Sequence, residues 1–149
     1  MSEESGDKQR LLIVDDSKVI RVTARKILQN HFETVEAVDG ENAWDLLSNE
    51  EPFSLVVSDL TMPELDGFGL LERIRSSHTP HIQNIPVIVI TGSNDSEAVK
   101  ERATKAGATD FIGKPFDSVD LLARTQALAA AHTTTTTLTE NNIALEDQL

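Results

Sequence analysis

Acidic, hydroxyl and basic side chains follow short apolar runs at four places in the chain. Asp15 and Asp16 follow the first run, and Asp59, Thr91 and Lys114 follow the other three. If the three carboxylates meet they repel one another, because two unit charges ~4 Å apart interact by about 4 kcal/mol at an effective dielectric of about 20. Such a cluster is tolerated only where a cation binds or protons are taken up.

An all-oxygen ligand set without histidine or cysteine selects a hard divalent cation. Mg²⁺ is the natural candidate, since it keeps coordinated waters that a phosphate oxygen can replace. The lysine and the threonine add an ammonium group and a hydroxyl donor to the same set. A metal, an ammonium, a hydroxyl and a carboxylate nucleophile are the parts that stabilise a phosphoryl group during transfer. The sequence therefore predicts phosphoryl chemistry on a carboxylate.

The elements that must position these side chains are short buried strands. Residues 55–57 form an apolar, largely β-branched run, which is typical of a strand covered on both faces. Pro63 cannot continue the ladder of that strand. Strands are expected over 11–14, 34–38, 55–57, 87–90 and 111–112. Helices are expected after Ser17, around 43–47, from near Gly67, after 94–96, and from Asp117 or Ser118 to about Ala131.

Five strand signals thus alternate with five helix signals. This alternation predicts an α/β fold, with a parallel sheet, helices on both faces and right-handed crossovers. For five strands we expect the flavodoxin-like (βα)5 doubly wound sheet with strand order 2-1-3-4-5. In that order the first, third, fourth and fifth strands are neighbours, so their polar ends can converge. The topological switch point, where ligands bind, lies between the first and third strands.

Local signals refine the helices. Phe68, Leu71 and Ile74 are expected to form the inner face of the third helix. Gly107 stands where a left-handed residue would end the fourth helix. Residues 76–84 are polar and contain a proline, and we expect a loop there.

Composition limits the classes of partner. The chain has 149 residues, of which 39% are hydrophobic and 26% charged, as in one globular domain with an appendage. With 25 acidic and 13 basic residues its formal net charge is −12. This charge argues against direct binding to nucleic acid or to an anionic membrane, and favours a cation or a basic protein surface. The absence of cysteine, of a signal-peptide pattern and of a membrane-spanning run favours a cytoplasmic location.

The two ends of the chain differ from its centre. We expect a polar tail over 1–9, a folded domain over 10–131, and a threonine-rich linker with an amphipathic tail over 132–149. Leucines at 138, 145 and 149, with an asparagine at 142, fit two heptads of a coiled coil. Two heptads leave the alternatives open: a frayed amphipathic tail or chain end, and a nascent coiled coil or linker to a further domain.

Taken together, the motifs resemble the receiver domain of two-component response regulators, such as those of chemotaxis. They are Asp15-Asp16, Asp59 followed by Met62-Pro63 and Gly67, Thr91-Gly92, and Lys114-Pro115. The resemblance extends over residues 10–131. It implies a signalling domain that accepts a phosphoryl group from a sensor histidine kinase or a histidine phosphotransfer protein. On this reading the chain is not an enzyme beyond its own phosphotransfer and autodephosphorylation.

The resemblance also implies a role for each acidic residue. Asp59 would be the phosphoacceptor. Asp16 and Asp59 would bind Mg²⁺ directly, the backbone carbonyl of Thr61 would be a third protein ligand, and Asp15 would hold a coordinated water. Mn²⁺ could substitute for Mg²⁺.

On the same resemblance, Lys114 would pair with the phosphoryl oxygens, and its bond to Pro115 would be cis. Thr91 would bond the phosphoryl group and shift toward it, and Phe111 would fill the space left. Phe111 lacks the phenolic hydroxyl of the tyrosine that is common at this position, so switching would depend on burial of the ring. Ser93 and Thr61 would influence dephosphorylation. The changed surface would be that of the fourth helix, fifth strand and fifth helix, read by a fused or separate effector or by a second copy in a homodimer.

Other classes fit the residues less well. A haloacid-dehalogenase-like phosphatase needs Asp-x-Asp after the first strand and a cap domain, whereas this strand ends in Asp15-Asp16-Ser17. A flavin carrier needs a hydroxyl- and glycine-rich loop there and aromatic residues, which make up only 4% of this chain. The intact acidic set and Lys114 speak against a degenerate receiver that only binds protein.

Overall fold

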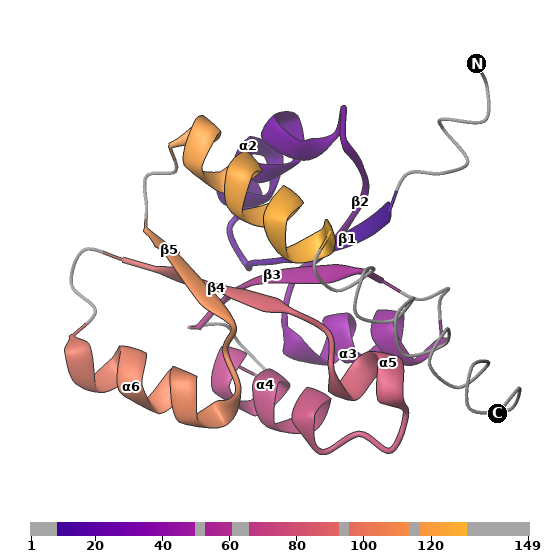
Figure 1. Cartoon of the computed structure of the whole chain (residues 1–149), viewed down its shortest axis with the longest axis vertical. Coiled ribbons are helices and arrows are strands. Elements are labelled where there is room, and N and C mark those ends of the chain that lie inside the picture. Colours follow the sequence, from indigo (N-terminus) through magenta and orange to yellow (C-terminus); the bar gives the residue numbers. More distant parts are fainter. Residues whose placement is uncertain (1–8, 50–52, 61–65, 93–95, 114–116, 131–149) are drawn as a thin grey trace, which may run out of the picture.

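The described strands form one parallel sheet, so their carboxyl ends lie along the same edge (Figure 1). The computed structural model describes residues 9–49, 53–60, 66–92, 96–113 and 117–130. The strands are β1 (Gln9–Val14), β2 (Phe32–Ala37), β3 (Leu55–Asp59), β4 (Val87–Thr91) and β5 (Asp110–Gly113). Their order is β2-β1-β3-β4-β5, with every pair parallel. The predicted fold and strand order are confirmed.

Helices cover both faces of this sheet. They are α2 (Lys18–Leu28), α3 (Gly40–Asn49), α4 (Gly67–Arg75), α5 (Pro80–Gln83), α6 (Glu97–Ala106) and an unlabelled helix over 118–130. Figure 1 shows α2 and the helix over 118–130 on one face, and α3, α4 and α6 on the other. None of the helices in the described ranges has the length and apolar character that a membrane crossing requires.

The central strands contain continuous apolar runs because each face of the sheet meets a separate helix layer. In β1, Leu11 and Ile13 pack toward α2, whereas Leu12 and Val14 pack toward α3 and α4. All four side chains are fully buried. Successive residues of a strand point to opposite faces, so a continuous apolar run is what a doubly covered strand needs.

Caps set the limits of the helices. The amide of Ile20 donates to the hydroxyl of Ser17 at 3.4 Å, which confirms the predicted start of α2. Gly107 ends α6 with φ of 117°, the left-handed conformation expected there. The carboxylate of Asp66 accepts from the amide of Gly69 at 2.9 Å and so begins α4.

Four local predictions need correction. Within the predicted loop over 76–84, residues Pro80–Gln83 form the one-turn helix α5. Proline suits the first position of a helix, where no amide partner is needed, so it starts this turn.

The inner face of α4 includes Leu70, while Phe68 is only partly buried beneath the guanidinium of Arg102, 3.9 Å from its ring centre. The strand predicted over 34–38 spans Phe32–Ala37, and Gln9, assigned to the polar tail, belongs to β1.

Arg75, the last residue of α4, connects this helix to neighbouring segments through hydrogen bonds. Its guanidinium donates to the carbonyl of Gly107 at 2.7 Å and to those of Gln83 and Ile85 at 2.8 and 2.7 Å. Burial lowers the pKa of this guanidinium. These bonds fix the end of α6 and the approach to β4 relative to α4, away from the carboxyl edge of the sheet.

Candidate functional site

Three carboxylates meet where β1 and β3 end. One carboxylate oxygen from each of Asp15, Asp16 and Asp59 lies within 4.8 Å of the others. The cause is the register of the two strands, in which Val14 pairs with Ser58, so the next residues, Asp15 and Asp59, emerge side by side. The convergence predicted from the sequence is therefore confirmed for these three residues.

Asp15 is fully buried and is held by its neighbours on several sides. Its amide donates to the carbonyl of Ala37 at 3.1 Å, at the end of β2. Its carboxylate accepts from the amide of Ser17 at 2.8 Å. Its carbonyl accepts from a guanidinium nitrogen of Arg21 at 2.8 Å. The backbone around this carboxylate is therefore fixed by both β2 and α2.

Asp59 is half-buried at the end of β3. Its carboxylate accepts from the amide of Leu60 at 2.8 Å, and its carbonyl accepts from the hydroxyl of Ser58 at 2.9 Å. Gly67, the first residue of α4, donates its amide to the carbonyl of Leu60 at 2.9 Å. A Cβ at Gly67 would lie 2.3 Å from the Asp59 carbonyl oxygen, so only glycine allows α4 to begin against this strand end.

Thr91 lies at the end of β4, next to β3, and Phe111 lies on β5, where it pairs with Val89. Asp59 pairs with Ile90 in the sheet, so Thr91 stands one residue further along the same edge. Thr91 is buried, and its hydroxyl donates to the carbonyl of Ile112 on β5 at 3.4 Å. Phe111 is partly buried and packs against the core on the side of α6. The ring is thus positioned between core and surface.

Arg124 forms two ion pairs near the start of β5. Arg124, on the helix over 118–130, bonds the carboxylate of Asp110 at 2.7 Å and that of Asp120 at 2.9 Å. Hydrogen bonds to Asp120 and then to Asp110 raise the pKa of Arg124. The bond to Asp110 links the start of β5 to the last described helix, whereas the bond to Asp120 lies within that helix.

Several predicted site residues lie outside the described residues. They are Thr61, Ser93, Lys114 and Pro115. β5 ends at Gly113, which pairs with Thr91, and Lys114 is the next residue of the chain.

The donor set fits a hard divalent cation. All three groups are carboxylates, and they grade from buried Asp15 through half-buried Asp59 to exposed Asp16. Oxygen donors of this kind suit Mg²⁺, which binds through one or two carboxylates and retains several waters. The exposure of Asp16 leaves the cluster open to solvent.

One group at this edge was not found from the sequence. Arg21, on α2, contacts the Asp15 carbonyl and also Glu36 on β2. An arginine six residues after an aspartate carries no diagnostic signal by itself. Its relation to Glu36 depends on the pairing of β1 with β2, which the sequence shows only through the fold.

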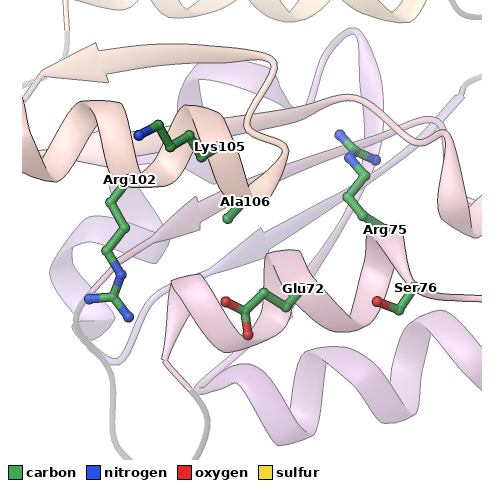
Figure 2. A pocket seen from close by; sticks show the side chains of 6 residues that line it. All are labelled: Glu72, Arg75, Ser76, Arg102, Lys105 and Ala106. Atoms are coloured by element: carbon green, nitrogen blue, oxygen red, sulfur yellow. The ribbon is translucent and has the colours of Figure 1, made fainter.

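A separate hollow lies between α4 and α6, and Figure 2 shows its lining. It encloses about 320 Å³ and is lined by Glu72, Arg75, Ser76, Arg102, Lys105 and Ala106. None of the site residues predicted from the sequence lines it. Arg75 is bonded to backbone carbonyls, and Arg102 lies over Phe68, so both arginines that line this hollow make contacts that stabilise the fold.

Comparison with known proteins gives a consistent match. The family model described as "Response regulator receiver domain" matches residues 11–126. The response regulator MprA of Mycobacterium sp. (strain KMS) is 38% identical over 120 residues, covering 80% of this chain and 50% of that protein. The chain thus spans about half the length of this relative.

Solved structures agree on the fold. The receiver domain of the Francisella response regulator 1452 is 31% identical, with a TM-score of 0.72 over 83% of this chain and 98% of that one. A putative response regulator from Chloroflexus aurantiacus J-10-fl is 27% identical, with a TM-score of 0.77 over 83% of this chain and 99% of that one. The chemotaxis protein CheY4 of Vibrio cholerae is 28% identical, with a TM-score of 0.73 over 81% of this chain and 98% of that one.

Proposed function

The chain belongs to the response regulator receiver domain family, and from this premise we propose that Asp59 accepts a phosphoryl group from a phosphohistidine of a partner protein. The observation that carries the proposal is the meeting of Asp15, Asp16 and Asp59 within 4.8 Å at the carboxyl ends of β1 and β3. This is the edge at which ligands bind in open α/β sheets. The partner is a sensor histidine kinase or a histidine phosphotransfer protein.

The transfer exchanges one phosphorus bond for another. A carboxylate oxygen of Asp59 bonds to phosphorus as the P–N bond to the partner's imidazole breaks. The nitrogen keeps the electron pair and takes a proton from solvent. In dephosphorylation a water oxygen attacks phosphorus, the bond to Asp59 breaks, and inorganic phosphate leaves with the carboxylate restored. The domain acts only on its own aspartate, as a signalling domain does.

Asp16 and Asp59 are the proposed direct ligands of Mg²⁺ or Mn²⁺, with Asp15 acting through a coordinated water and Thr61 through its carbonyl. When bound, the cation neutralises the carboxylate cluster and polarises the phosphoryl oxygens. The proposed role of Lys114 is to pair with those oxygens. The carboxylates that repel one another in the metal-free cluster would thereby act as ligands of the cation.

Readout is proposed to pass from Thr91 to Phe111. The Thr91 hydroxyl, which now donates to Ile112, would turn to an oxygen of the phosphoryl group. The space it leaves would admit the ring of Phe111. Phosphorylation would then shift a two-state equilibrium of the face made by α6, β5 and the helix over 118–130.

The wider assembly is also a proposal. The receiver unit would span 10–131, in the cytoplasm, with residues 132–149 as a linker or tail. Because the chain spans half of a relative that is itself a response regulator, the output would lie in a fused or separate effector, or in a homodimer.

Phosphorylation by a small-molecule donor tests this function. We expect acetyl phosphate with Mg²⁺ to add one phosphoryl group to the full chain, measured by intact mass, and to add none to Asp59→Asn. Asp45→Asn is the matched control, since Asp45 is an exposed aspartate on α3. Equal uptake by Asp59→Asn and the unchanged chain would show that Asp59 is not the acceptor, and no uptake by the unchanged chain would reject the function.

A further inference from the structure

We propose that Arg21 is a positioning residue for the acidic cluster: it fixes the peptide group between Asp15 and Asp16, and so the direction in which Asp16 presents its carboxylate. The proposal deepens the proposed function, because it rests on Asp16 being a ligand of the cation. Arg21 itself would contact neither the cation nor the phosphoryl group.

The contacts of Arg21 join three elements. From α2, one terminal nitrogen of its guanidinium donates to the carbonyl of Asp15 at 2.8 Å, and its Nε donates to Glu36 on β2 at 3.2 Å. The side chain is only 13% exposed. The other oxygen of Glu36 accepts from Arg25, one turn further along α2, at 3.1 Å. Glu36 thus bonds both arginines and holds the guanidinium of Arg21 through its Nε.

The bond from Arg21 to the Asp15 carbonyl matters because of the peptide group that it holds. A peptide group is planar, so the Asp15 carbonyl and the Asp16 amide turn together. The preceding peptide is held by the bond from the Asp15 amide to Ala37, and the following one by the bond from the Ser17 amide to the Asp15 carboxylate. The middle peptide is held by Arg21. Asp16 is exposed, so its direction depends on the backbone more than on packing.

Positioning and simple electrostatics predict opposite effects. The guanidinium is positive and close to the cluster, so its charge alone opposes the binding of a cation. If charge were its main influence, removing it would tighten the binding of Mg²⁺. If it positions Asp16, removing it weakens binding, as the loss of outer partners of metal ligands does, by about 10- to 100-fold.

Binding of Mg²⁺ alone to the full chain, measured by calorimetry, decides between these effects. We expect Arg21→Gln to raise the dissociation constant at least about 10-fold. Arg21→Lys should raise it by less, since a lysine can reach one of the two partners but lacks the planar fork that bridges both. Arg25→Gln is the matched control: it removes the same charge from the same helix and also takes away a partner of Glu36. The guanidinium of Arg25 bonds Glu36, whereas the Asp15 carbonyl is bonded by Arg21, so we expect binding to be unchanged or tighter.

Amide hydrogen exchange of the metal-free chain is the second readout. We expect faster exchange at Asp16 and Ser17 in Arg21→Gln than in Arg25→Gln, with similar exchange in the centre of β4. Unchanged or tighter Mg²⁺ binding in Arg21→Gln, or an equal loss in Arg25→Gln, would overturn the positioning role alone. Absence of Mg²⁺ binding by the unchanged chain would instead overturn the proposed function, and the positioning role with it.

Discussion

Replacing Gly67 by alanine adds only a methyl group, yet it should disturb the end of β3. The added Cβ would lie 2.3 Å from the carbonyl oxygen of Asp59 and 2.7 Å from the Cα of Leu60. Both are backbone atoms of the strand end that carries the candidate phosphoacceptor, so no side-chain rotation relieves the contact. Either α4 or the strand end must move by roughly an ångström.

The magnitude follows from two opposing contributions. Overpacking of a well-packed site costs about 1–3 kcal/mol, and a clash with backbone belongs at the upper end. Alanine in place of glycine within a helix returns at most about 1 kcal/mol, and less at the first helical residue. We therefore expect Gly67→Ala to lower the free energy of unfolding by about 2 kcal/mol.

Urea unfolding measures this loss through Trp44, the single tryptophan of the chain, which packs against the core from α3. For an m value of about 2 kcal/mol/M, the midpoint should fall by about 1 M. Gly113→Ala is the control, since a Cβ there meets nothing within 4 Å and the same atoms are added. Equal midpoints for the two variants would refute the argument that α4 must begin in contact with the Asp59 carbonyl.

Two further predictions use the same assay. Gly107→Ala should lower the free energy of unfolding by about 2 kcal/mol, because a left-handed residue with a Cβ is strained and the new atom would lie 2.5 Å from Cγ of Arg75. In an Arg75→Ala background this loss should become smaller without vanishing, since only the contact is relieved. An unchanged loss in that background would refute the contact. Asp16→Asn should stabilise the metal-free chain by about 1 kcal/mol through reduced repulsion, and should abolish the rise in midpoint that Mg²⁺ gives the unchanged chain; a variant that still responds to Mg²⁺ would contradict the role of Asp16.

The strands were predictable because burial on both faces leaves a plain signal. A strand such as Val87–Thr91 must be apolar over residues 87–90 to pack against two helix layers, and the polar Thr91 marks its carboxyl end. Strand order then followed from the alternation of elements. The meeting of Asp15 with Asp59 is a consequence of that order, so it too was contained in the sequence.

The features that were missed depend on contacts between distant segments. The one-turn helix Pro80–Gln83 is too short to leave a periodic pattern, and its proline resembles a loop signal until the helix start is seen. Leu70 faces inward because α4 packs between α3 and α6, which the apolar spacing of α4 alone did not reveal. Arg21 meets Glu36 only because β1 and β2 pair in parallel.

In the carboxylate cluster, the backbone holds close together side chains whose negative charges repel one another. The fold anchors Asp15 and Asp59 through hydrogen bonds to their own strand ends and to β2, and the charge they share cannot be relieved by turning away. Phosphorylation of Asp59 would add further negative charge to the same place. On the proposed mechanism, phosphoryl transfer and cation binding therefore depend on each other. The phosphoryl group adds oxygen ligands for the cation, and the cation compensates the negative charge of the phosphoryl group. A fold that held the three carboxylates less firmly would let them separate, and this coupling would weaken.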